Sequence, residues 1–370
     1  MYDQLREETL YSMLYAVVTT IAMLASCYLL FRRANAIAPN VTPPVRLRRW
    51  TAAFFAVFVV NHLWYLGPTF FLTSDDDVKL TNMIGILLDS MTFFPLSIIV
   101  LLVMLQDRRR PLWPVAVMVA PLILGMVWCV VWRSDALFPL LNGYLLLMSI
   151  CLIIYMVRAL RQYGRWLRDN YADLEHKEVW QSFVVLAVIL LVFAIYVLAG
   201  GSLIYEFILQ VIVIVLICYL LWRVETLSDL STPQPQSLPA DETTTEEIED
   251  NPLLPTIRDN IEALLQQHCI DTQLYLQHDL TVSQLAQAIG INRLYLSQYF
   301  SRQGISYNAY INDLRINHFV SLYREAVAAQ RHFTAQQLAH DSGYQSYSTF
   351  SLAFKQRMGQ SVTVWMRSAD

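Results

Sequence analysis

Seven long apolar runs fill most of the first 226 residues of the 370-residue chain and restrict what it can fold into. Runs of this length approach or exceed the ~20 residues that an α-helix needs to cross a bilayer. Because unpaired backbone groups cannot remain in lipid, each run is predicted to be a spanning helix. The predicted spans are residues 10–31, 50–72, 83–105, 112–132, 137–157, 179–199 and 203–222. The alternative is one miscounted or re-entrant segment, for which the short seventh run is the first candidate.

The basic residues between the runs predict an orientation. Cytoplasmic loops of membrane proteins are enriched in Lys and Arg, and three alternate loops carry nearly all of them here. Those residues are Arg32, Arg33, Arg46, Arg48, Arg49, Arg108, Arg109, Arg110, Arg158, Arg161, Arg165, Arg168 and Lys177. The other loops contain only Lys79 and Arg133. We therefore expect a multi-pass protein of the bacterial inner membrane, with its N-terminus outside and its C-terminal domain in the cytoplasm.

The composition changes after the last run and predicts three parts. Residues 1–226 form the predicted seven-helix transmembrane domain. Residues 227–252 contain seven acids, no base and little apolar periodicity, which is typical of a disordered linker. Residues 253–370 have the composition of a soluble domain. We expect the acidic linker to hold this domain off the membrane surface.

Catalytic and metal-binding patterns are absent from the sequence. The five cysteines include no metal-ligand pair and predict neither a disulfide framework nor a zinc finger. His62, Asp89 and Glu206 lie in predicted spans, where ionisable groups are costly, so an intramembrane enzyme is an alternative. A catalytic zinc site needs about three protein ligands, whereas the spans contain one histidine. We expect no cofactor and no enzymatic activity.

Two stretches of the soluble part repeat one pattern. "LTVSQLAQAIGINRLYLSQYF" and "FTAQQLAHDSGYQSYSTFSLAF" each read as a helix, a turn at Gly290 or Gly343, and a second helix. Apolar residues spaced four apart predict the buried face of each second helix. The intervening "YINDLRINHFVSLYREAVAAQ" has helical periodicity and predicts one long connecting helix. The two helix-turn-helix units, residues 281–302 and 334–357, would then form one two-part binding domain joined by this helix.

Residues 280–367 resemble the DNA-binding domain of AraC/XylS-type transcription regulators, which contains paired helix-turn-helix motifs. The resemblance rests on the two repeats, on "YINDLRINH" and on "GYQSYSTFSLAFKQRMG". It implies that residues 292–302 and 346–356 are recognition helices that enter successive major-groove faces of double-stranded DNA. Leu352, Gln298 and Val362 depart from the family pattern, and the first two remove potential phosphate contacts. Dimerisation in the membrane as a homodimer would offset that loss.

Helical phase divides each expected recognition helix into two faces. Leu296, Phe300, Phe350 and Phe354 are predicted to face inward. The residues predicted to face DNA are Arg293, Ser297, Gln298, Arg302, Ser346, Tyr347, Ser348, Ser351 and Lys355. We expect Arg293, Gln298 and Tyr347 to contact bases, and Arg302 and Lys355 to contact phosphate. From residue 280 onward, eight Lys or Arg residues stand against four Asp or Glu, a modest excess that also fits a domain that binds a protein partner.

Polar residues in the outer halves of the predicted spans suggest a ligand site. Asn61, His62, Asp89, Asn142 and Glu206 fall at roughly 5–15 Å from the outer ends, estimated from a rise of about 1.5 Å per residue. Because a charge exposed to lipid is costly, these groups are expected to face one cavity open to the periplasm. In the alternative, Glu206 lies at the membrane interface and Asn61 and His62 are hydrogen-bonded core residues.

The sequence as a whole predicts an all-α protein in which a seven-helix transmembrane bundle precedes a soluble bipartite helix-turn-helix domain. The expected function is that of a membrane-embedded one-component transcription regulator. Its partners would be double-stranded DNA, the lipid bilayer and a signal molecule or membrane partner of unknown identity. The competing functions are a receptor whose helical C-terminal domain binds a protein, and an intramembrane enzyme.

Overall fold

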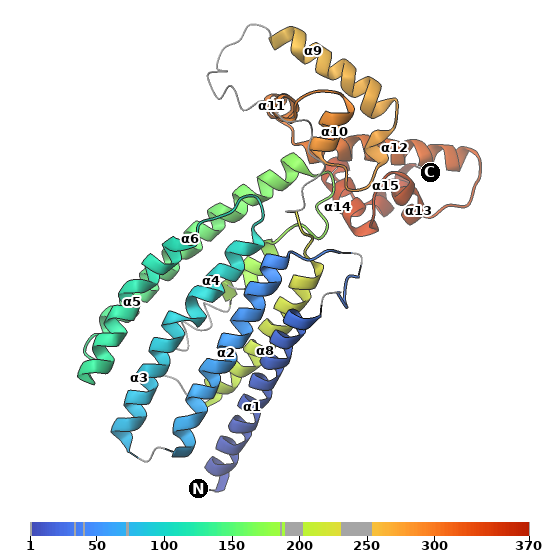
Figure 1. Ribbon diagram of the computed structural model, residues 1–370. Coiled ribbons are helices and arrows are strands. Elements are labelled where there is room, and N and C mark those ends of the chain that lie inside the picture. The colour runs from blue at the N-terminus through green and yellow to red at the C-terminus, as the bar shows by residue number, and fades with distance from the viewer. Residues whose placement is uncertain are drawn as a thin grey trace. The chain divides into compact units, whose positions relative to one another are not determined.

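The computed structural model describes residues 2–32, 35–39, 41–71, 74–185, 187–188, 203–230 and 254–369. The described residues form helices and turns but no strand, as the apolar periodicity predicts. The chain divides into two compact units (Figure 1). The N-terminal unit comprises Met1–Tyr163 and His176–Thr232, and the C-terminal unit comprises Gly164–Glu175 and Pro233–Asp370. The predicted linker at 227–252 lies almost wholly outside the described residues.

The described helices of the N-terminal unit are long and apolar. They are α1 (Tyr2–Phe31), α2 (Val45–Phe71), α3 (Asp75–Met91), α4 (Phe93–Met104), α5 (Trp113–Trp132), α6 (Phe138–Asn170) and α8 (Leu203–Thr226). Helix α1 packs against α2 and α8, and α2 also packs against α3 and α4. Helix α3 contacts α5, and buried side chains of α5 and α6 form one apolar cluster. Figure 1 shows α1, α2 and α8 running side by side.

Five of the described helical segments are long and apolar enough to cross a membrane, which suggests membrane association. They are Thr9–Phe31, Asp76–Met104, Trp113–Trp132, Phe138–Asn170 and Phe207–Thr226. They coincide with the first, third, fourth, fifth and seventh predicted spans. The second predicted span falls on α2, whereas most of the sixth, 179–199, lies outside the described residues. The count of seven and the orientation therefore stay predictions.

The third predicted span, residues 83–105, is two helices rather than one. Helix α3 ends at Met91, and Thr92 has non-helical dihedral angles of φ −124° and ψ −66°. Pro95 explains the break, because proline has no N–H to donate and its ring clashes with the carbonyl four residues earlier. The Thr92 hydroxyl donates to the Leu88 carbonyl at 2.6 Å.

The region after the fifth predicted span is also different from the expectation. Residues 158–170 were predicted as part of a cytoplasmic loop, but α6 continues through them to Asn170. The physical reason is local: this stretch has no proline and contains four Arg and two Leu, which are good helix formers. The helix therefore extends well past the apolar run 137–157.

The C-terminal unit is a set of short helices around one long one. They are α9 (Leu254–Leu265), a π turn η1 (Gln266–Ile270), a 3-10 turn η2 (Leu274–Leu276), α10 (Val282–Ala288), α11 (Arg293–Arg302), α12 (Tyr307–Ala328), α13 (Ala335–Asp341), α14 (Tyr347–Met358) and α15 (Val362–Ala369). Helix α12 is the predicted connector. Its Ile311 belongs to an apolar core with α9, α10 and α11, and its Phe319 belongs to a second core with α13, α14 and α15.

Candidate DNA-binding surface

The same capping arrangement opens both helix-turn-helix units. At the start of α10, the Gln284 backbone N–H donates to the Thr281 hydroxyl at 3.2 Å, and the Thr281 N–H donates to the Gln284 side chain at 2.9 Å. Thr334 and Gln337 repeat this capping box at the start of α13. Such reciprocal bonds satisfy backbone donors that a helix N-terminus leaves unpaired. The Thr-x-x-Gln spacing shared by the two repeats is the sequence signal of both capping boxes.

Both turns contain a glycine in the left-handed region. Gly290 has φ +73° and Gly343 has φ +89°, values that residues with a side chain rarely adopt. The surroundings of the two glycines differ. A Cβ on Gly290 would meet nothing within 4 Å, whereas a Cβ on Gly343 would lie 2.8 Å from the Leu276 carbonyl oxygen. The turn of the second unit therefore packs directly against the backbone of η2, which precedes the first unit.

The second helices of the two units agree with the expected recognition helices. Helix α11 follows Asn292, whose side chain caps the Leu294 N–H, and α14 follows Ser346, whose hydroxyl accepts from the Thr349 N–H. The residues predicted to face inward are buried, with exposed fractions of 3 % or less; they are Leu296, Phe300, Phe350 and Phe354. Their burial fixes which face of each helix is turned to solvent.

The residues predicted to face DNA lie on the outer sides of α11 and α14. Arg293, Arg302, Ser348 and Lys355 are exposed, and Ser297, Gln298, Ser346, Tyr347 and Ser351 are partly buried. Several of them also have contacts within the protein. The Ser346 hydroxyl is occupied as a helix cap, and the Tyr347 ring packs 5.8 Å from the Phe350 ring. The geometry thus places eight of the nine on the two helices and Ser346 at the N-cap of α14, and their DNA contacts remain predictions.

Arg315 is a residue of the site's framework that sequence reasoning missed. It lies in the middle of α12 with 0 % exposure. Its guanidinium donates to the carbonyls of Tyr275 (2.7 Å) and Gln277 (2.8 Å), and it lies over the Tyr344 ring at 5.5 Å. These partners come from the η2 region before the first helix-turn-helix unit and from the turn of the second unit, so Arg315 ties both to the connector. In the sequence, the position of Arg315 between the apolar residues of "YINDLRINH" was the signal that its side chain could be buried.

The C-terminal unit buries the Cys269 thiol in its first apolar core. Burial raises the pKa of the Cys269 thiol to about 12, which keeps it protonated at neutral pH and unlike a nucleophilic thiolate. Among the residues that the structure describes, no three His, Cys, Asp or Glu side chains come together to hold a metal ion.

The structure brings together some of the residues predicted to form a pocket in the N-terminal unit. The Asn61 side chain donates to Asp89 at 2.7 Å and to Thr92 at 3.2 Å, and the Tyr65 hydroxyl donates to Asp89 at 2.9 Å. His62 is adjacent in sequence, with its ring stacked 4.3 Å from the Tyr15 ring.

The remaining predicted pocket residues are elsewhere. Asn142 is exposed on α6, and the side chain of Glu206 lies outside the described part of the chain. A separate apolar cavity lies between α2, α4, α8 and residues 182–185, and none of the five predicted residues lines it. Its lining comprises Phe54, Ser97, Val100, Leu101, Ser182, Val185, Leu216, Tyr219 and Leu220.

Comparison with known proteins supports the assignment of the C-terminal surface. Residues 285–368 match a family model described as "Helix-turn-helix domain". No curated protein and no solved structure matches the chain. The matched residues run from α10 to α15 and include both recognition helices. The match supports an AraC-type DNA-binding domain at these residues of the C-terminal unit.

Proposed function

We propose that this protein is a membrane-embedded one-component transcription regulator. In this proposal α11 and α14 bind double-stranded DNA from the cytoplasmic face of a bacterial inner membrane. The N-terminal bundle anchors the chain and senses a signal. Regulation requires no catalysis, so the proposed protein is not an enzyme and needs no cofactor.

The observation that carries the proposal is the duplicated helix-turn-helix unit. Each unit has the same capping box, the same turn glycine and a second helix whose opposite face is exposed. Such a helix fits the major groove of B-DNA. The two helices are attached to one continuous connector, α12, whose side chains enter both cores. This rigid attachment would let them read successive groove faces.

Charge divides the proposed contacts into two kinds. Arg302 and Lys355 lie toward the ends of α11 and α14 and suit phosphate contacts, which provide most of the affinity. Arg293 and Gln298 suit bidentate hydrogen bonds to guanine and adenine edges. Leu352, 61 % exposed on α14, replaces a potential phosphate contact with an apolar side chain. A homodimer would compensate by placing two such domains on one DNA molecule.

An electrophoretic mobility assay at several salt concentrations tests DNA binding. A DNA-binding protein releases counterions, so the logarithm of its affinity must fall linearly with the logarithm of salt concentration. Genome-wide crosslinking of the native protein to DNA would then identify the target promoters. Absence of binding at low salt, with correctly folded protein, would refute the regulator.

Signal sensing rests on the polar cluster in the bundle. Asp89 accepts hydrogen bonds from Asn61 and Tyr65, and ionisable groups in spanning helices commonly mark a functional site. In this proposal the cluster responds to a ligand that enters from the periplasm. A helix break at Thr92, next to the cluster, gives α3 and α4 a point about which they can move.

A protein partner for the C-terminal domain is the second candidate function. The exposed Leu352 and Tyr295 side chains favour it, since apolar surface on a recognition helix suits protein more than DNA. In that case the protein would show no salt-dependent DNA binding, and crosslinking in cells would recover a protein instead of DNA.

A further inference from the structure

A short stretch from the far end of α6 is built into the DNA-binding domain. Residues 170–175, here called the docked segment, belong to the C-terminal unit although more than 75 positions separate them from α9. Tyr171 forms an antiparallel bridge with Thr281, and the Ala172 N–H donates to the Leu280 carbonyl at 3.0 Å. The Ala172 side chain is 2 % exposed and belongs to the apolar core of the first helix-turn-helix unit.

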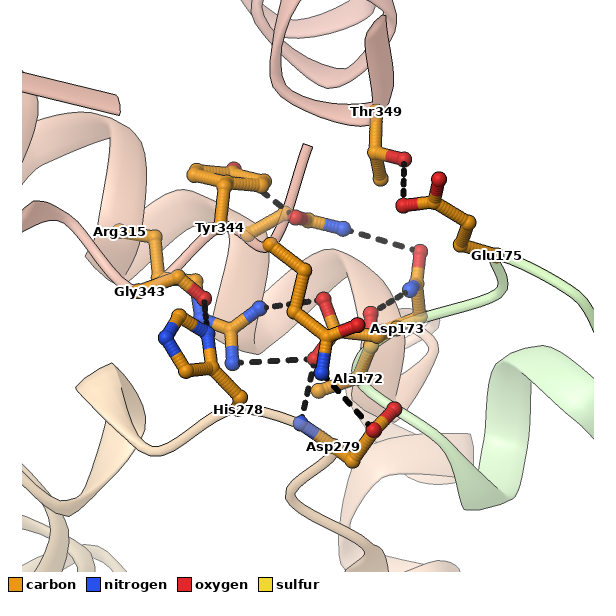
Figure 2. A network of polar contacts seen from close by, with 12 residues as sticks. Ala172, Asp173, Glu175, His278, Asp279, Arg315, Gly343, Tyr344 and Thr349 are labelled. Atoms are coloured by element: carbon orange, nitrogen blue, oxygen red, sulfur yellow. Dashed lines mark hydrogen bonds and ion pairs between the residues drawn. The ribbon is translucent and has the colours of Figure 1, made fainter. Parts of the chain in front are cut away.

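The centre of the docked segment fills a site built for a carboxylate. Asp173 contacts the buried guanidinium of Arg315 at 2.7 Å, and the two side chains are 5 % and 0 % exposed. The second Asp173 oxygen accepts the Asp279 N–H at 2.8 Å. Figure 2 shows Asp173 between Arg315 and Asp279. A buried guanidinium without a counter-charge is strongly destabilising, so Arg315 makes the site specific for an acidic segment.

The two ends of the docked segment touch both recognition helices. The Asn170 side-chain oxygen accepts a hydrogen bond from Arg293, the first residue of α11. The Thr349 hydroxyl in the first turn of α14 donates to Glu175 at 3.1 Å (Figure 2). Arg293 is one of the three residues expected to contact bases, and a carboxylate beside α14 would repel the phosphate backbone. The segment therefore occupies an expected DNA contact of α11 and places a carboxylate at the first turn of α14.

We propose that the docked segment is a built-in competitor of DNA, and that DNA binding requires one end to release Arg293 and the other to withdraw Glu175 from the first turn of α14. This inference rests on the proposed DNA-binding function. Because α6 is one continuous helix from Phe138 to Asn170, it connects the segment covalently to the fifth predicted span. A signal that moves α6 would then change the fraction of molecules with a free recognition surface, and so the apparent DNA affinity.

A reversible crosslink tests the competition directly. Residues opposite each other in an antiparallel bridge have Cα atoms about 4.5–5.5 Å apart, which suits a disulfide. The double variant Tyr171→Cys/Thr281→Cys of the full chain, in lipid nanodiscs, would hold the segment docked when oxidised. The probe is a mixed-sequence DNA duplex of roughly four helical turns at low salt. Each single variant, treated with the same oxidant, controls for the lost tyrosine and the lost Thr281 cap.

We expect oxidation to weaken DNA binding of the double variant at least about tenfold, because the competent fraction falls, and reduction to restore it. Equal affinity in the oxidised and reduced forms would overturn the inference while leaving the DNA-binding function intact. If the reduced variant and the unmodified chain both fail to bind the duplex, the DNA-binding function itself is wrong and the inference falls with it.

A second pair of variants tests the segment without any crosslink. Asn170→Ala and Glu175→Gln each remove one contact to a recognition helix and leave the Asp173–Arg315 pair in place. Each should tighten binding of the same duplex by roughly fivefold, which corresponds to a net hydrogen-bond contribution of about 1 kcal/mol. Glu178→Gln is the matched control, since it removes a nearby exposed carboxylate that belongs to the N-terminal unit. Equal binding by all three variants would contradict the inference.

Discussion

Substitution of the two turn glycines by alanine separates backbone strain from close packing. Both glycines have positive φ, so an alanine at either position costs about 1–2 kcal/mol of strain. At Gly343 the new Cβ would also lie 2.8 Å and 2.9 Å from the Leu276 carbonyl oxygen and Cα, and 3.1 Å from Arg315 Nε. Backbone atoms cannot rotate away, so overpacking adds roughly 1–3 kcal/mol. We expect Gly343→Ala to cost about 2–5 kcal/mol and Gly290→Ala about 1–2 kcal/mol.

Pulse proteolysis in urea measures this difference in the detergent-solubilised full chain. A short protease treatment at each urea concentration cuts only unfolded domains, so the surviving C-terminal fragment reports the unfolding midpoint. Gly290→Ala is the matched control, because it has the same strain and open space around its Cβ. Equal midpoint shifts for the two variants would refute the idea that the Gly343 turn is packed against the backbone of η2.

Four further expectations follow from the structure. Phe354→Ala, which empties a fully buried position in the second core, should destabilise the C-terminal unit by roughly 3–5 kcal/mol in the same proteolysis assay. Lys355→Ala should weaken DNA binding about evenly across sequences and reduce the salt slope by ~1, whereas Arg293→Ala should change base preference by roughly 1–3 kcal/mol in competition gel shifts. Asp89→Asn replaces an oxygen that accepts a hydrogen bond with an amide group that donates one; it should abolish signal-dependent transcription at normal protein level, while Asn142→Ala should leave the response unchanged. A periplasm-active reporter should be active when fused in the 73–79 loop and silent when fused after Arg223, and the reverse pattern would place the DNA-binding domain on the wrong side of the membrane.

The local elements of the C-terminal unit could be predicted well from the sequence. Helix periodicity, the turn glycines and the four-residue spacing of Phe350 and Phe354 are short-range signals, and each depends on residues within one or two turns of a helix. The two recognition helices therefore begin within a residue of their predicted starts. The same reasoning is weaker in the N-terminal unit, where uniform apolarity hides helix ends. It predicted one unbroken helix in the third span, where Thr92 and Pro95 divide α3 from α4, and a loop where α6 continues to Asn170.

Polar clusters were harder to predict because their members come from different helices. Depth along the spans suggested five pocket residues, but only Asn61 and Asp89 among them share hydrogen bonds in the described structure. Their partners Tyr65 and Thr92 were not predicted, because a single hydroxyl in an apolar run does not indicate a polar cluster. Which side chains face each other across a bundle depends on the rotation of each helix about its axis, and uniform apolarity does not fix that rotation.

The sequence by itself determined the all-helical class, the long apolar helices and the duplicated helix-turn-helix motif. All three depend on hydrophobic periodicity and composition, which are properties of the sequence. Only the tertiary structure decided that Asp173 belongs to the DNA-binding domain. Asp173 and Arg315 are 142 positions apart and come from segments that the domain boundaries of the sequence would separate. The opposite charges nearby in sequence, Lys177 and Asp313, do not form this pair, and Asp313 contacts Arg357 instead. A charged group enters a core only when its counter-charge is brought to it, and that pairing exists only once the chain has folded.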